Sequence, residues 1–120
     1  MTESEVLAKL AAQALDEKKG NDVQILDLRG LSSAPCALFV IASGNVPSHV
    51  SSLSDHVHEV MKKATGLNPS KLEGYNNAEW ILMDYFDVVV HIFLQQKRDF
   101  YRLEQLWGDA ARMEFATKQA

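Results

Sequence analysis

The sequence is poor in several features that would point to specialised chemistry. Cys36 is the only cysteine among the 120 residues, so an internal disulfide is impossible and the chain is typical of a reducing compartment. No apolar run approaches the ~20 residues that span a bilayer. Lysine and arginine number 12 against 16 acidic residues, and the net charge of −4 predicts no general attraction to nucleic acid or to an anionic membrane. A basic protein partner matches this charge better.

Targeting features are also missing from the N-terminal segment. It carries Glu3 and Glu5 and lacks a basic region, a long apolar core and a cleavage signal, so we expect a cytoplasmic protein. Hydrophobic residues make up 47% of the chain, and no repeat or linker-like stretch interrupts it. We therefore expect a single domain over residues 1–111, followed by a flexible tail over 112–120.

Hydrophobic periodicity in the first third predicts a helix followed by two strands. An amphipathic helix is expected to begin near Thr2 or Ser4, whose hydroxyls can cap it, and to stop with a left-handed residue at Gly20. A strand is expected over 22–28. The run 36–42 is apolar throughout, which predicts a strand covered on both faces, with helices on either side of a sheet. The fold class is therefore α/β.

Two further helices are predicted in the rest of the chain. One begins at Pro47 and ends at Gly66, because proline favours the first turn of a helix and glycine tolerates the left-handed stop. The other covers 98–110. Its apolar side is expected to carry Phe100, Leu103, Leu106 and Trp107.

A β-hairpin is predicted between these helices. The apolar stretches 79–84 and 87–94 are separated only by Tyr85 and Phe86, which is the spacing of a two-residue turn. Counting outward from this turn gives the register. Asp84 is expected opposite Asp87, Leu82 opposite Val89, and Trp80 opposite His91.

The two faces of this hairpin differ in composition. Period-2 alternation makes one face entirely aliphatic, which predicts core. The other face is expected to carry Trp80, Leu82, Asp84, Asp87, Val89 and His91. Such a mixture suits a contact surface for another molecule, because tryptophan buries a large area while its indole N–H bonds a partner. A half-covered core face is the alternative interpretation.

The sequence shows no convincing catalytic or metal-binding constellation. His49 and His56 can share a helical face, but no cysteine or carboxylate completes a metal site. Ser43-Gly44 follows the buried strand, yet the glycine-rich phosphate motifs are absent, so a tight turn is the preferred interpretation. No Asp-x-Asp or Asp-x-Glu pair is present to hold two magnesium ions. We therefore expect no catalytic residue, no cofactor and no metal.

Residues 72–110 carry an ordered series of motifs. They are a Glu-Gly pair, a Trp that begins a strand, Asp-x-x-Asp-Val-x-Val-His, and Arg-x-x-Tyr-x-Leu-Glu-x-Leu-Trp. The matching residues are Glu73, Gly74, Trp80, Asp84, Asp87, Val88, Val90, His91, Arg98, Tyr101, Leu103, Glu104, Leu106 and Trp107. This series resembles the signature of the Iojap or ribosomal silencing factor family, and weaker matches extend the resemblance over about residues 3–110.

The chain departs from the family pattern at two positions. Ala37 stands where the family usually has an aspartate before the buried strand, which leaves any role of that acid unsupported here. Phe86 stands where the hairpin usually has glycine. Because phenylalanine resists positive φ, this departure argues against a two-residue primed turn.

The resemblance implies a fold and a function. The fold is a small α/β domain with a mixed sheet flanked by helices, similar to the nucleotidyltransferase fold without its catalytic acids. Members of the family bind the large ribosomal subunit at its universal protein fourteen, which blocks joining of the small subunit and silences translation when nutrients are scarce. Steric exclusion of this kind implies a protein that is not an enzyme.

Trp80 is the expected central anchor of that contact. The other expected contact residues are Glu73, Leu82, Asp84, Asp87, His91, Tyr101 and Glu104. Two alternatives stay open. Ser43-Gly44 and the implied fold would suit a nucleotide-binding or nucleotidyltransferase-like enzyme, and an exposed Trp80 face would suit a homodimer.

Overall fold

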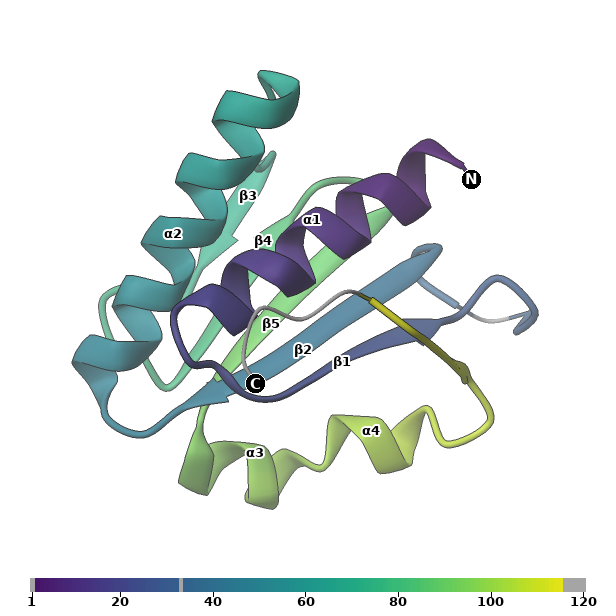
Figure 1. The fold of residues 1–120 in the computed structure, drawn as a ribbon. Helices are drawn as coiled ribbons and strands as arrows, with labels where there is room; N and C mark the ends of the chain where they lie inside the picture. The colour runs from purple at the N-terminus through teal and green to yellow at the C-terminus, as the bar shows by residue number, and fades with distance from the viewer. Residues whose placement is uncertain (1, 33, 116–120) are drawn as a thin grey trace.

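A computed structural model, which describes residues 2–32 and 34–115, shows a six-stranded mixed sheet with helices on both faces (Figure 1). The elements are α1 (Glu3–Glu17), β1 (Asn21–Asp27), β2 (Leu38–Gly44), α2 (Pro47–Thr65), β3 (Lys71–Glu73), β4 (Trp80–Asp84), β5 (Val88–Leu94), α3 (Gln95–Tyr101), α4 (Leu103–Leu106) and β6 (Ala111–Met113). The strand order is β3-β4-β5-β2-β1-β6, in which β2 and β5 are parallel and the other neighbours are antiparallel. The predicted α/β class, with a mixed sheet flanked by helices, is confirmed.

Local sequence predicts the start of α1 better than its end. Thr2 and Glu5 form a reciprocal capping box, in which the Thr2 hydroxyl accepts from the Glu5 N–H at 3.2 Å and the Glu5 carboxylate accepts from the Thr2 N–H at 3.3 Å. The left-handed residue after the helix is Lys19, with φ 62°, and not Gly20 as predicted. Gly20 is needed for a different reason, because a Cβ there would lie 2.9 Å from the carbonyl oxygen of Leu15.

The central strand β2 is covered on both faces. All seven of its residues are buried, which confirms the expected double-covered strand, although it begins two residues later than predicted. Figure 1 shows α1 and α2 on one side of the sheet and α3 and α4 on the other. The larger core lies under α1 and α2, and a smaller cluster that includes Leu26, Phe39, Phe93 and Leu103 lies under α3 and α4. The predicted stop of α2 at Gly66 is also confirmed, with φ 77°.

The predicted continuous helix over 98–110 is wrong. Arg102 adopts a left-handed conformation, with φ 50°, and separates α3 from α4. One left-handed residue resets the helical phase, so residues before and after it no longer share a face. Leu103 is buried as expected, whereas Phe100 and Leu106 are 77% and 73% exposed. The expected apolar face of a single helix is therefore divided between the interior and the surface.

Two short edge strands were not predicted. Lys71–Glu73 forms β3 and Ala111–Met113 forms β6, and three residues are too few for periodicity to reveal. Arg112 and Met113, where we expected the tail to start, instead pair with Leu26 and Ile25 of β1. Residues 116–120 of the expected tail lie outside the described residues.

Candidate functional site

The hairpin between β4 and β5 has the predicted faces but not the predicted register. Trp80 pairs with Phe93 and Leu82 pairs with His91, so each partner lies two residues further along β5 than expected. The hairpin closes through a hydrogen bond of 2.8 Å from the Tyr85 N–H to the Val88 carbonyl. Because the slip is even, every strand residue keeps its face.

Asp87 leaves the expected face as a result of the slip. It lies in the turn with Phe86, and both are exposed. We expected phenylalanine to resist the positive φ that a two-residue turn needs. Phe86 nevertheless adopts a positive φ, of 71°. Asp84 supports this conformation, since its carboxylate accepts the Phe86 N–H at 2.7 Å.

Glu73, Trp80, Leu82, Asp84 and Tyr101 form what we call the Trp80 surface. Glu73 on β3 lies directly opposite Leu82 on β4, so an acidic and an aliphatic side chain are neighbours on this face. Trp80, Leu82 and Asp84 are only half-buried. On this side of the sheet the smaller core cluster lies over β1, β2 and β5, and Trp80 at the start of β4 packs against this cluster and against Tyr101 of α3. The surface is therefore an apolar strip with acidic neighbours.

Gly74 explains the Glu-Gly pair in the sequence. Its φ of 79° is left-handed, and a Cβ at this position would overlap the carbonyl oxygen of Trp80. Only glycine lets the chain leave β3 so close to the start of β4. Gly74 thereby places Glu73 next to Leu82.

His91 lies beneath the Trp80 surface and not on it. It is 4% exposed, and burial lowers its pKa to about 4, so the imidazole is neutral at neutral pH. The Trp80 indole N–H donates to Nδ1 of His91 at 3.1 Å, which requires the tautomer with its proton on Nε2. His91 is therefore buried and not at the surface as expected, and the indole N–H of Trp80 is already used inside the chain.

Aromatic side chains connect the core to the exposed part of α3. The Trp80 ring stacks on buried Phe93 with centroids 4.9 Å apart and contacts Tyr101 at 4.7 Å. Tyr101 in turn meets the edge of Phe100 at 5.2 Å. Phe100 thus extends the Trp80 surface, and sequence reasoning missed it because the predicted helix placed this side chain in the core.

Arg98 holds α3 and α4 against the sheet. It is 4% exposed, its Nε donates to Glu104 at 3.0 Å, and its terminal nitrogens donate to the Asn21 carbonyl, the Ser43 hydroxyl and the Asp22 carboxylate at 3.0, 3.3 and 3.2 Å. Glu104, an expected contact residue, is consequently engaged inside the chain. Its carboxylate positions the segment that carries Tyr101.

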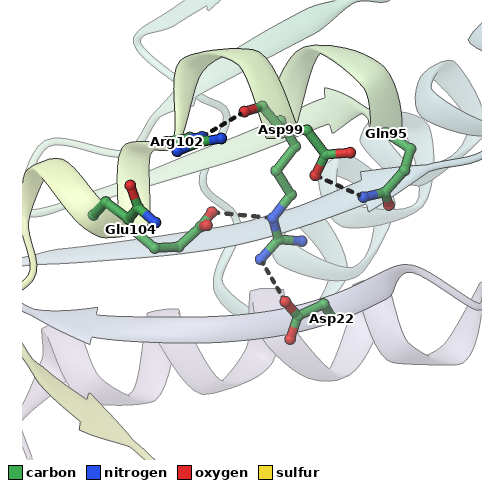
Figure 2. Close-up of a pocket in the computed structure, with 7 residues that line it drawn as sticks. Asp22, Gln95, Asp99, Arg102 and Glu104 are labelled. Carbon is green, nitrogen blue, oxygen red and sulfur yellow. Dashed lines mark hydrogen bonds and ion pairs between the residues drawn. The ribbon is translucent and has the colours of Figure 1, made fainter.

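A polar cavity of about 360 Å³ surrounds this arginine (Figure 2). Its lining residues are Asp22, Gln95, Arg98, Asp99, Arg102, Glu104 and Gln105. Figure 2 shows Asp22 and Glu104 approaching the buried guanidinium from different elements, while Gln95 and Asp99 bond each other at 3.5 Å. We interpret the cavity as part of the bracing network, because most of its charged groups pair with one another.

The Ser43-Gly44 segment is occupied by internal contacts. The Ser43 hydroxyl donates to Gln95 at 2.6 Å, and the Asn45 N–H is bonded to Nδ1 of His49 at 3.1 Å. A Cβ at Gly44 would lie 3.0 Å from the backbone nitrogen of Val50, so glycine favours the close packing of α2 on β2. The structure therefore explains Gly44 by its close packing against α2 and not by the tight turn that we expected. Over residues 2–32 and 34–115, no group of three His, Cys, Asp or Glu side chains is placed to hold a metal ion.

None of the helices in the described part of the chain is long and apolar enough to cross a membrane.

Known bacterial proteins resemble the chain over nearly its full length, and a mouse protein resembles part of it. The family model described as "Ribosomal silencing factor during starvation" matches residues 1–120. The Bacillus subtilis protein named "Ribosomal silencing factor RsfS" is 36% identical over 115 residues, which cover 94% of this chain and 96% of that protein. A crystal structure from Chromobacterium violaceum has a TM-score of 0.83 at 36% identity, covering 96% of this chain and 93% of the other. The mouse protein named "Mitochondrial assembly of ribosomal large subunit protein 1" is 31% identical over 71 residues, which cover 58% of this chain and 31% of that protein.

Proposed function

Because the chain belongs to the ribosomal silencing factor family, we propose that it represses translation by binding the large ribosomal subunit at its universal protein fourteen. Occupying the face that meets the small subunit would block subunit joining by steric exclusion, above all when nutrients are scarce. This mechanism requires tight docking and no catalysed reaction. We therefore propose a cytoplasmic regulator that is not an enzyme, and the name of the mouse relative supports the large subunit as the class of partner.

The observation that carries this proposal is the composition of the Trp80 surface. A half-buried tryptophan lies among aliphatic, aromatic and acidic side chains, with Tyr101 of α3 beside it and Glu73 opposite the neighbouring Leu82. Large aromatic residues at the centre of an interface commonly supply most of its affinity. Carboxylates around such a centre favour a basic partner and speed its encounter. A basic ribosomal protein offers the positive charge that these carboxylates would attract.

The proposed residues divide into three roles. Trp80 is the anchor, and Leu82 and Tyr101 supply apolar area beside it. Glu73, Asp84 and Asp87 form an acidic rim. His91 and Glu104 act as positioning residues, His91 by bonding the indole of Trp80 and Glu104 by holding Arg98.

Co-sedimentation with isolated large and small ribosomal subunits tests the function directly. We expect stoichiometric binding to the large subunit and a loss of joined ribosomes on the same gradients. If no binding occurs at micromolar concentration, the proposal is wrong. Saturable binding of a nucleoside triphosphate with magnesium would instead favour a nucleotide-binding enzyme.

A matched pair of charge reversals tests the proposed surface. Glu73→Lys places a cation on the Trp80 surface, whereas Glu59→Lys makes the same charge change on α2, across the sheet, where Glu59 pairs with Lys63. We expect only Glu73→Lys to weaken binding. Equal weakening would indicate a general attraction without a local site. Sedimentation over a concentration series would also show whether a homodimer forms and competes with the subunit.

A further inference from the structure

Phe86 combines two unfavourable features at the tip of the hairpin. Its φ of 71° lies in the left-handed region, where a side chain other than glycine, asparagine or aspartate is strained. Its side chain is 78% exposed, so burial of the ring within the chain contributes almost no free energy to offset that strain. A bulky residue that opposes the local backbone and gains no burial indicates a role outside the folded chain.

The turn holds this ring in a defined place. The Asp84 carboxylate accepts the Phe86 N–H at 2.7 Å, and Tyr85, only 4% exposed, anchors the preceding position in the core. On the other side, the Ser4 hydroxyl at the start of α1 donates to the Asp87 carboxylate at 3.3 Å. The ring is therefore presented on a braced support, which lowers the entropy lost when a partner binds it.

We propose that Phe86 is a second anchor, which inserts into an apolar pocket with a rim of lysine or arginine side chains on the same basic protein that the Trp80 surface binds. The carboxylates of Asp84 and Asp87, on either side of Phe86 in the sequence, would attract the lysine or arginine side chains of that rim. Lys71 lies opposite Asp84 in the backbone register of β3 and β4 and offsets part of this negative charge, so the apolar contact supplies most of the effect. This inference rests on the proposed function for the identity of the partner and adds the contact at the hairpin tip.

Both anchors fit within one interface of ordinary size. At the rise of a β-strand, the path from Trp80 to Phe86 is roughly 20 Å long. An interface that buries about 800 Å² on each partner is roughly 30 Å across. Leu82 and Asp84 lie between the two anchors on the half-buried face of β4, so the contact between them is continuous.

The test compares variants of Phe86 in the intact chain by thermal unfolding and by binding to purified large subunits. Phe86→Gly and Phe86→Asn accept the positive φ, so we expect an unfolding midpoint equal to or above that of the unchanged chain. We expect both to bind the subunit about tenfold or more weakly. Phe86→Trp keeps a large ring and should stay within about threefold of the unchanged chain. Val46→Ala, which removes exposed apolar surface at the opposite end of the sheet, should change neither property.

Four results would overturn the inference, and they separate it from the proposed function. Binding by Phe86→Gly within about twofold of the unchanged chain, with binding lost in Trp80→Ala, would reject the second anchor and keep the function. A clear fall in the unfolding midpoint of Phe86→Gly would show that Phe86 is structural. Loss of a dimer in this variant, with subunit binding unchanged, would assign the tip to a second copy of the chain. No subunit binding by the unchanged chain would reject both proposals.

Discussion

The indole N–H of Trp80 donates a hydrogen bond of 3.1 Å to Nδ1 of His91. The two rings lie 5.9 Å apart at 42°, so the buried imidazole holds the half-exposed indole in one tilted orientation. The bond exists only while His91 is neutral, since a protonated imidazole has no free acceptor. A residue within the sheet thereby controls how the proposed anchor is presented to a partner.

Acid should weaken the fold through His91. The pKa of His91 is about 4 in the folded chain against 6.5 for an ordinary histidine, so the unfolded chain takes up a proton that the folded chain excludes. The contribution of His91 to the free energy of unfolding is complete above pH 6.5 and falls by roughly 3 kcal/mol as the pH drops toward 4. Urea unfolding of the wild-type chain and His91→Phe at several pH values measures this difference. Identical pH dependence in the two proteins would contradict it.

Truncation of Trp80 should remove most of the affinity for the large subunit. Trp80→Ala deletes the ring that contacts Phe93 and Tyr101, and loss of a central interface aromatic commonly costs about 2 kcal/mol or more. Binding is measured by titration against purified subunits. Trp107→Ala is the matched control, because Trp107 packs on Phe39 in the smaller core cluster. We expect this variant to lower the free energy of unfolding more than the affinity for the subunit. If folded Trp80→Ala bound with unchanged affinity, the anchor assignment would be wrong.

Loss of Arg98 should loosen α3 and α4. Arg98→Met removes the guanidinium that bonds Glu104, Asp22 and Ser43, and we expect the free energy of unfolding to fall by about 2 to 3 kcal/mol. Arg98→Lys should restore little, because one ammonium cannot reproduce the planar fork of donors. Denaturant unfolding gives the energy, and amide hydrogen exchange should be faster in α3 and α4. An unchanged unfolding midpoint would show that the network contributes nothing to stability.

A side chain at Gly44 should destabilise the chain. In Gly44→Ala the new Cβ would lie 3.0 Å from both the backbone nitrogen and Cγ2 of Val50, so the start of α2 would have to move by a few tenths of an ångström. Overpacking of this kind costs about 1 to 3 kcal/mol. Gly30→Ala is the control, because nothing lies within 4 Å of a Cβ at that position. Equal thermal unfolding midpoints for the two variants would refute the steric explanation.

The elements that the sequence predicted correctly depend on local rules. The hydroxyl cap at Thr2, the left-handed stop at Gly66 and the apolar run of β2 each involve neighbouring residues. The faces of the hairpin were also predictable, because alternation depends only on odd or even position along a strand. The same parity places Trp80, Leu82 and His91 on one face whatever the register of the two strands, provided that any slip is even.

The errors came from features that the hydrophobic pattern does not contain. The hairpin register was wrong by two residues, because the Asp84 carboxylate accepts the Phe86 N–H and supports a positive φ that a phenylalanine side chain disfavours. The break at Arg102 divided a predicted helix and turned Phe100 outward. The short strands β3 and β6 carry no periodic signal, since their partners in β4 and β1 define them.

The class of fold, the central strand and the residues that share a face with Trp80 follow from the amino-acid sequence, because they depend on the repeat of the backbone and the burial of apolar side chains. Which of those residues reach the surface depends instead on the packing of separate elements. Burial of His91 beneath Trp80 and the ion pair between Glu104 and Arg98 depend on such packing. The free energy of contacts like these cannot be predicted from a local pattern of residues.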